Sequence, residues 1–296
     1  MALFPSRSRS TVSPGAFFAT AAELVRSASL ELIPTPKVAD HFAHLRPGAP
    51  VTVTCSPVRG IDATLDVAAH LLDLGHPVVP HLAARMVETP AHVARISRWL
   101  RDHDVHDVFL IGGDAPTPMG AYVDALALAR ALLEAGAPLA RVGSAAYPDG
   151  HAMIPAHTLD TALLDRQQLL DEARVGGWIS TQMCFESEIL ADWIVRQRNR
   201  GVHLPVHLGV PGAVETAKLL TIGLKLGVGA SLRYLRKNRA AVSRLVGPGG
   251  FDPLELIGPI VARDDFATLG VEALHIFTFN QVAGTEAWRG NLLAEH

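Results

Sequence analysis

Two acidic side chains stand where carboxylates could move protons. Glu31 lies between leucines in a short apolar run, and Asp114 follows two glycines at the end of another run. A carboxyl group in apolar surroundings stays protonated more readily, which makes Glu31 a candidate general acid. The alternative is that Glu31 points into solvent at a rim or pairs with an arginine.

The turn Gly112-Gly113-Asp114 has the features of a ligand site. Two glycines let a ligand approach the backbone closely, and the aspartate adds a negative charge. The turn lacks the G-x-G-x-x-G spacing of a dinucleotide fingerprint. The alternative interpretation is a tight turn in which Asp114 caps the next helix.

Gln182 and His81 also lie in apolar runs. The amide of Gln182 offers donors and an acceptor, which suits a heterocycle with mixed edges, although a satisfied core amide is the alternative. A lone histidine such as His81 is more often packed than a ligand. We expect no metal site, because the one H-x-x-x-H spacing, from His203 to His207, spans Pro205 and does not lie on a helix.

A repeating pattern of eight short apolar runs must position these residues. Longer stretches with helical spacing separate the runs. Eight alternations of strand and helix are typical of a (β/α)8 TIM barrel, an α/β fold whose active site lies at the carboxyl ends of the strands. The runs span residues 29–34, 50–55, 76–83, 107–113, 141–147, 178–185, 206–211 and 273–279.

Helices are expected between these runs. A long helical region over 214–245 predicts an extra helix after the seventh strand, and glycines at 247–250 predict a loop. We expect residues 1–20 to be a disordered or loosely attached lead-in, and residues 21–296 to form a single catalytic barrel. The other helical segments are 17–27, 62–75, one opening at 89–90, 119–135, 158–174 and 187–198.

The composition fits one large globular domain with buried strands. Of 296 residues, 49% are hydrophobic and 19% are charged, and the formal net charge is −3. No basic field is present to bind nucleic acid, and no apolar run reaches the roughly 20 residues that a membrane-spanning helix needs. Cys55 and Cys184 both lie in predicted strands, so we expect no disulfide framework and a reduced, cytoplasmic setting.

Seven strand-end motifs follow one another along the chain. They are LELIPTPK at 30–37, TVT at 52–54, PHL at 80–82, GD at 113–114, AAYPDGH at 145–151, STQ at 180–182 and HIFTFN at 275–280. In this order they resemble the motifs of the methylenetetrahydrofolate reductase family, in its short, single-domain bacterial type. Each motif alone is weakly specific, but together they extend from about residue 29 to residue 282.

The resemblance implies a cytoplasmic flavoprotein of one-carbon metabolism and methionine biosynthesis, an oxidoreductase acting on CH–NH donors. Such a TIM barrel binds FAD and reduces 5,10-methylenetetrahydrofolate to 5-methyltetrahydrofolate with NADH or NADPH. Glu31 would be the catalytic acid that protonates N10 as the five-membered ring opens, and Asp114 would stabilise the cationic iminium. Gln182 and Phe277 would bind substrate, Phe277 replacing a tyrosine. The implied FAD contacts are Thr54, His81, Gly113, Asp114, Tyr147 and His151.

The chain departs from the family pattern near the cofactor. Gly112 stands where an arginine is frequent, and Leu-Asp-Glu at 170–172 replaces a basic pair that can hold the FAD diphosphate. Arg166 or Arg174 could compensate for the missing pair. No aromatic residue for stacking on nicotinamide follows Pro211 directly. A flavin-independent variant therefore stays open.

Two other hypotheses remain. The chain could be a folate-binding barrel subunit that needs a partner or a non-nicotinamide electron donor, running as a methyl-folate oxidase. A flavin barrel acting on proline-like amines shares the fold but explains Gln182 less well. Tetrahydrofolate derivatives are the expected small-molecule partners, with neither nucleic acid nor membrane. A homo-oligomer, or an electron-donor partner protein, is compatible with the sequence.

Overall fold

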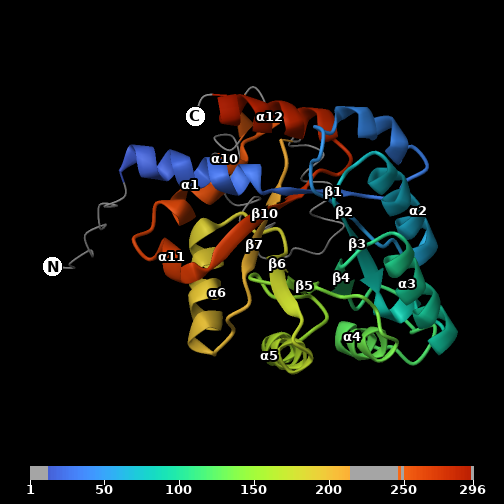
Figure 1. Ribbon diagram of the computed structural model, residues 1–296. Coiled ribbons are helices and arrows are strands. Elements are labelled where there is room, and N and C mark those ends of the chain that lie inside the picture. Colours follow the sequence, from blue (N-terminus) through green and yellow to red (C-terminus); the bar gives the residue numbers. More distant parts are fainter. Residues whose placement is uncertain (1–12, 214–245, 248–249, 295–296) are drawn as a thin grey trace.

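Eight parallel strands close into one barrel surrounded by helices in the computed structural model (Figure 1), which describes residues 13–213, 246–247 and 250–294. This confirms the expected (β/α)8 fold. Around the barrel the strands follow the order β1-β10-β7-β6-β5-β4-β3-β2. The strands are β1 (Ser29–Leu32), β2 (Val51–Val53), β3 (Val78–Ala83), β4 (Asp107–Ile111), β5 (Arg141–Ala146), β6 (Gly176–Thr181), β7 (Val206–Pro211) and β10 (Val271–Phe277).

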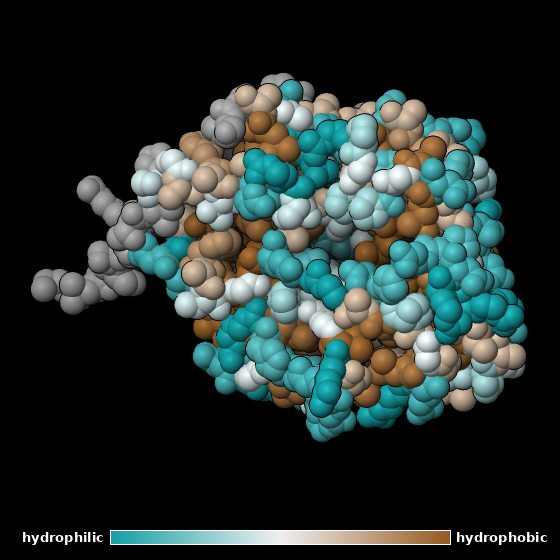
Figure 2. Space-filling model, viewed as in Figure 1, coloured by the Kyte–Doolittle hydropathy of each residue, from teal (hydrophilic) through white to brown (hydrophobic). Residues whose placement is uncertain are grey.

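Helices connect successive strands and cover the outside of the barrel (Figure 1). On the face shown in Figure 2, hydrophilic side chains dominate the surface over α2 and α3. The extra helix expected in 214–245 lies outside the described residues. The helices are α1 (Pro14–Arg26), η1 (Val38–His44), α2 (Gly60–Asp73), η2 (Ala84–Met86), α3 (Pro90–Asp102), α4 (Ala125–Glu134), α5 (Ala156–Ala173), α6 (Ser187–Asn199), α10 (Pro253–Val261), α11 (Phe266–Leu269) and α12 (Val282–Ala294).

Alternation along each strand decides which side chains reach the barrel interior. In β1, Leu30 and Leu32 are fully buried in the apolar core shared with the helices. Glu31, between them, therefore points to the other side, into the barrel. The same period of two in β10 directs His275 and Phe277 inward. The leucines thus stabilise the strand while the intervening position stays free for a polar group.

The helix after β4 begins later than the 119–135 pattern predicts. The Asp124 carboxylate accepts a hydrogen bond of 2.8 Å from the Ala127 N–H and caps α4. A carboxylate at this position satisfies a backbone donor that has no partner within the helix. Asp124 therefore has the capping role, and the alternative in which Asp114 caps this helix is wrong.

Three further expectations differ in detail. Cys55 and Cys184 lie just beyond the ends of β2 and β6, and both are buried. The segment expected as a loop at 247–250 contains part of a two-stranded antiparallel sheet formed by β8 (Val246–Gly247) and β9 (Gly250–Phe251). The helix expected from residue 17 begins at Pro14, so the proposed boundary at residue 20 falls inside α1.

The N-terminal and C-terminal helices are tied to each other by one arginine. Arg289 on α12 is almost completely buried. Its Nε donates to the carbonyl of Val25 at 3.0 Å, and its Nη2 donates to that of Arg26 at 2.7 Å. These carbonyls at the end of α1 lack helical partners, so the guanidinium satisfies them and complements the helix dipole. α1 thereby lies beside α12 and α10 (Figure 1).

We predict that Gly143→Ala destabilises the barrel. A Cβ at this position in β5 would overlap the rings of Trp178 and Phe109. Overpacking a filled interior costs about 1–3 kcal/mol, which urea denaturation measures as a fall in the free energy of unfolding. Gly290→Ala on α12 is the control, because its Cβ would enter open space. Equal effects of the two substitutions would contradict the prediction.

Candidate active site at the carboxyl ends of the strands

The parallel barrel brings the carboxyl ends of all its strands to one end of the molecule. Glu31 lies near the end of β1, in register with Phe277 at the end of the neighbouring strand β10. Tyr147 and Gln182 each follow a strand directly, after β5 and β6, and Asp114 comes three residues after β4. The predicted residues therefore lie at the same end of the barrel.

The nearest partner of Glu31 is a histidine. The Nε2 atom of His275 lies 2.9 Å from Oε2 of Glu31. Both side chains are largely buried, with 12% of Glu31 and 3% of His275 exposed. Glu31 is therefore neither solvated nor paired with an arginine, and its surroundings are less apolar than expected. The pair can share one proton, since an imidazole nitrogen either donates to a carboxylate or accepts from a carboxyl group.

Sequence reasoning assigned no role to His275. The signal was present, because His275 precedes Phe277 by two residues in an otherwise apolar run and so shares its inward face. Its pairing with Glu31 depends on the contact between the first and last strands of the barrel. The sequence indicates which side chains of a strand share a face. It does not indicate which residues of two neighbouring strands lie side by side.

His81 lies inside β3, two residues before the strand ends, and is buried in the barrel. Its ring stacks on Phe109 with centroids 4.5 Å apart and lies 5.9 Å from the ring of His275. Burial lowers the pKa of His81 well below its ordinary value, and the nearby His275 lowers it further. The ring is therefore neutral at pH 7. Its Nε2 atom is buried and has no hydrogen-bond partner among the described residues.

Glu31, His81 and His275 form a cluster whose ligand-type atoms lie within 4.8 Å of one another. Two imidazoles and a carboxylate are groups that bind transition metals. The direct hydrogen bond between Glu31 and His275, however, joins two of the three candidate ligand atoms to each other. The arrangement is therefore a hydrogen-bonded pair of Glu31 and His275 with the neutral His81 beside it.

The loop after β4 is shaped by one glycine and held by one arginine. Gly113 has φ +91°, and a Cβ there would lie 3.0 Å from the Cβ of Ala83. Glycine adopts this conformation without strain and lets the loop pack closely against Ala83. Arg85 donates from Nε to the carbonyl of Ala115 and from Nη2 to that of Pro116, both at 2.7 Å. These bonds fix the loop that carries the exposed Asp114.

Tyr147 and His151 form a ring pair after β5, with centroids 5.0 Å apart and an edge-to-face geometry. Burial raises the pKa of Tyr147, the Arg166 guanidinium opposes this rise, and the Asp114 carboxylate adds to it. Tyr147 therefore stays protonated and lies within electrostatic reach of both charges. The phenol can act as a hydrogen-bond donor at this end of the barrel.

Gln182 and Thr54 each make hydrogen bonds to neighbouring residues. The Oε1 atom of Gln182 accepts a hydrogen bond of 2.8 Å from the Met183 N–H. Among the described residues, the amide NH2 group of Gln182 has no corresponding hydrogen bond to a neighbouring backbone group. Thr54 at the end of β2 donates its N–H to Leu32 at 2.9 Å, and its carbonyl accepts from the hydroxyl of Thr64. The first contact sets the direction of the Gln182 side chain, and the other two hold the backbone of Thr54.

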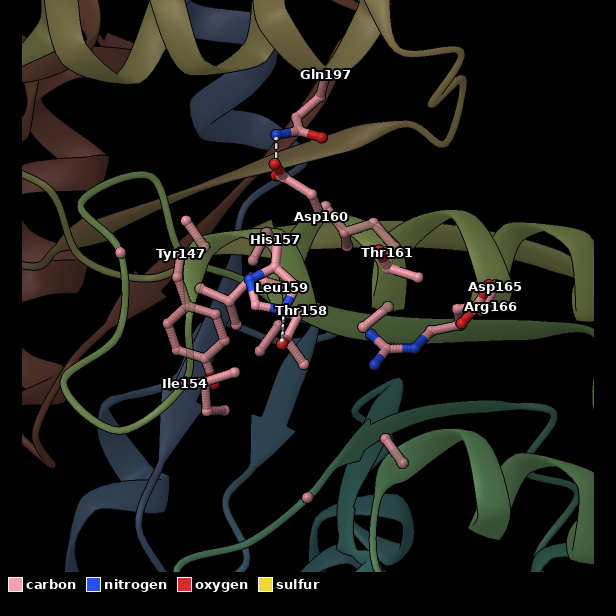
Figure 3. A pocket seen from close by; sticks show the side chains of 18 of the residues that line it. Tyr147, Ile154, His157, Thr158, Leu159, Asp160, Thr161, Asp165, Arg166 and Gln197 are labelled. Carbon is pink, nitrogen blue, oxygen red and sulfur yellow. Dashed lines mark hydrogen bonds between the residues drawn. The ribbon is translucent and has the colours of Figure 1, made fainter.

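A cavity of about 650 Å³ lies beside the ends of β4 and β5 (Figure 3). Its walls come from those strand ends, the start of α4, most of α5 and the second half of α6. Tyr147 lines it, whereas Glu31, Asp114 and Gln182 are not among its lining residues. This cavity therefore adjoins the predicted residues on one side rather than enclosing them.

The two arginines that could replace the missing basic pair have different surroundings. Arg166 lines the cavity (Figure 3), whereas Arg174 is exposed in a left-handed conformation at the end of α5. At the positions 170–172 themselves, Leu170 is buried in the core and the two acids that follow are exposed.

No protein-family model matches the chain. In the described residues, no helix is both long and apolar enough to cross a membrane. The class that fold and site define is a (β/α)8 barrel with titratable side chains at the carboxyl ends of its strands, and such a barrel supports many reactions.

We predict that His81→Asn makes stability less dependent on pH. The pKa of His81 is lowered in the folded protein, so only the unfolded chain gains a proton there as the pH falls through about 6.5. The stabilisation is therefore present above that pH and lost below it, at up to about 1.4 kcal/mol per pH unit. Urea denaturation between pH 7.5 and pH 5 measures the slope. His157→Asn, at an exposed position, is the control and should follow the wild type.

Proposed function

We propose that the chain interconverts 5,10-methylenetetrahydrofolate and 5-methyltetrahydrofolate. The observation that supports this best is the Glu31 carboxyl, hydrogen-bonded to His275 at 2.9 Å and next to Phe277 at the carboxyl end of the barrel. A reaction that opens the five-membered ring needs a proton on N10, and a carboxyl that shares a proton with an imidazole can supply it. The order of the strand-end motifs adds independent support.

In this proposal, Glu31 gives its proton to N10 while the bond between N10 and the methylene carbon breaks. The carbon stays on N5 as a cationic iminium, and hydride addition to it produces the methyl group. His275 keeps Glu31 in position and stabilises the carboxylate that the proton transfer leaves. The negative charge of Asp114, on the loop fixed by Arg85, favours the iminium. The NH2 group of Gln182 and the ring of Phe277 would contact the pterin.

FAD, when bound, would supply the hydride and would itself be reduced by NADH or NADPH. The residues present fit such a cofactor in one respect. Two buried nitrogen atoms of Arg166 have no hydrogen-bond partner among the described residues, and Arg166 lines the cavity. Tyr147, His151 and Thr54 are the other residues that would hold it. His81 lies below the rim and would act through packing.

A partner-dependent folate oxidoreductase is the second candidate. A Cβ at Gly212, the first residue after β7, would overlap the side chain of Thr285 on α12. No aromatic side chain fits at that position, and residues 214–245 lie outside the described structure. A site that lacks this stacking contact for nicotinamide favours an electron donor of another kind.

We predict that Glu31→Gln lowers the turnover of methylenetetrahydrofolate about 10²–10⁴-fold, because a positioned acid contributes that factor. The amide keeps the size of the side chain and removes the transferable proton. Steady-state kinetics with added FAD and NADH, or with a chemical reductant, measure kcat. Glu134→Gln, at the exposed end of α4, is the matched control. An unchanged rate in Glu31→Gln would reject Glu31 as the acid.

The two candidate functions predict different electron donors. If the site lacks a nicotinamide contact, NADH should give little turnover and reduced methyl viologen should give full turnover. If the chain works as an independent reductase, both donors should reduce methylenetetrahydrofolate at similar rates. The measurement is methyltetrahydrofolate formed per enzyme with each donor, and comparable rates would contradict the partner-dependent candidate.

A further inference from the structure

His81 has a buried nitrogen that no described residue pairs with. The residue is 4% exposed inside β3, and its Nε2 atom has no hydrogen-bond partner among the described residues. A polar atom left unpaired in a protein interior costs free energy. Because the ring of Phe109 stacks on the imidazole at 4.5 Å between centroids, only a small group fits beside the ring. A water molecule or a metal ion is small enough to satisfy this nitrogen.

Two further side chains bring ligand-type atoms to the same place. Glu31 on β1 and His275 on β10 each contribute one such atom, and these two atoms and one of His81 all lie within 4.8 Å of one another. The strands β10, β1, β2 and β3 are consecutive around the barrel, so one arc of its wall carries the whole cluster (Figure 1). Three residues far apart in the sequence therefore converge on one point in the barrel interior.

The separations within the cluster suit a single ion. Oε2 of Glu31 and Nε2 of His275 lie 2.9 Å apart. Zinc binds nitrogen and oxygen ligands at about 2.0–2.2 Å, so two ligands of one ion stand about 3–3.5 Å from each other. The carboxylate and the first imidazole are already this close. The His81 ring, whose distance to the others is at most 4.8 Å, needs only a small movement to complete the site.

Aromatic side chains hold the two imidazole rings in place. The centroid of Phe109 lies 4.5 Å from that of His81 and 6.0 Å from that of His275. Phe277 packs against His275 from another side, with centroids 5.0 Å apart. Rings that are already ordered lose little freedom when they bind an ion, so the site is preorganised. Glu31 has the most exposed side chain of the cluster, at 12%, so a further ligand would enter on its side.

The donor set selects the kind of ion. Two imidazoles and one carboxylate are ligands of catalytic zinc sites and of non-haem iron sites, in which further positions stay open. Magnesium and calcium prefer sites made of oxygen atoms. In the part of the chain that the structure describes, Glu31 has no lysine or arginine at ion-pair distance, so its negative charge is available to a cation. These features favour a transition-metal ion over a bridging water molecule.

We propose that Glu31, His81 and His275 bind a divalent transition-metal ion, Zn²⁺, and that the bound ion switches off the acid. The hydrogen bond between Glu31 and His275 belongs to the metal-free form of the cluster. When both atoms give lone pairs to the ion, the proton between them leaves for solvent or for Nδ1 of His275. Glu31 then has no proton to give to N10. The metal site follows from the cluster alone, whereas the inhibition rests on the proposed function.

The binding test uses the full chain, stripped of metal with EDTA and free of folate. Titration calorimetry with Zn²⁺ gives the stoichiometry and the dissociation constant, and visible absorption on adding Co²⁺ reports nitrogen ligands. We expect one tight site for Zn²⁺, and no comparable binding of Mg²⁺. Absence of a Zn²⁺ site in the wild type, as expected if a water molecule bridges the cluster, would overturn the proposal.

Variants show which residues bind the ion. His81→Phe keeps an aromatic ring against Phe109 and removes the ligand nitrogen, and Glu31→Gln replaces the carboxylate by a weaker neutral ligand. Each should bind Zn²⁺ at least about tenfold more weakly, since even residues that only orient a metal ligand contribute about 10–100-fold. His203→Phe removes an exposed histidine and should bind as the wild type does.

Circular dichroism checks that each variant is folded, and Glu31→Gln carries the test if His81→Phe does not fold. A Zn²⁺ affinity unchanged in the folded variants of the cluster would overturn the proposal. A loss of affinity confined to His203→Phe would overturn it as well, because the ion would then bind at the surface.

Folate turnover separates this inference from the proposed function. Zn²⁺ should inhibit the wild type, and EDTA should restore its rate. His81→Phe should need at least about tenfold more Zn²⁺ to halve its own rate. Folate turnover by a wild type that binds no Zn²⁺ at the cluster rejects this inference and keeps the proposed function. Zn²⁺ binding that depends on Glu31 and His81, without any folate turnover, keeps the metal site and rejects the folate chemistry.

Discussion

The pairing of β1 with β10 is the constraint on which the candidate site depends. It closes the barrel, places Glu31 in register with Phe277, and brings the imidazole of His275 to the Glu31 carboxyl. The hydrogen bond between Glu31 and His275 joins residues 244 positions apart in the chain. The buried leucines on either side of Glu31 stabilise the strand. The fold therefore does not depend on a stabilising contribution from Glu31. A polar group can therefore be kept inside the barrel for chemistry.

Much of the fold could be predicted from the spacing of apolar residues and from the positions of proline and glycine. Apolar runs such as that around Leu30 mark strands buried on the helix-facing side, and Pro90 after Thr89 marks a helix start that the structure confirms. The boundaries were harder. The helix before β5, α4, begins at Ala125 because the Asp124 carboxylate before it satisfies the Ala127 N–H. An alanine-rich sequence does not reveal this contact.

The candidate site was predictable in its location but not in its contacts. Parallel strands force Glu31, Asp114 and Gln182 to one end, and this follows from the alternation of strand and helix. The partner of Glu31 depends on barrel closure, and the depth of His81 depends on where β3 ends, so neither could be read from a local pattern. Two nitrogen atoms of Arg166 have no hydrogen-bond partner in the part of the chain that the structure describes, and this too is a property of packing that a local pattern does not give.

The bond network of Arg289 has a consequence for how the molecule is made. β1 leaves the ribosome early, but its neighbour β10 and the arginine that secures α1 are synthesised last. Until then, one edge of β1 has no strand to pair with, and the nascent chain exposes apolar surface that would be covered in the finished barrel. A polypeptide that stops before residue 271 would lack this closing strand even if all the preceding elements formed correctly. The contact between Glu31 and His275 is thus available to completed chains and not to growing ones.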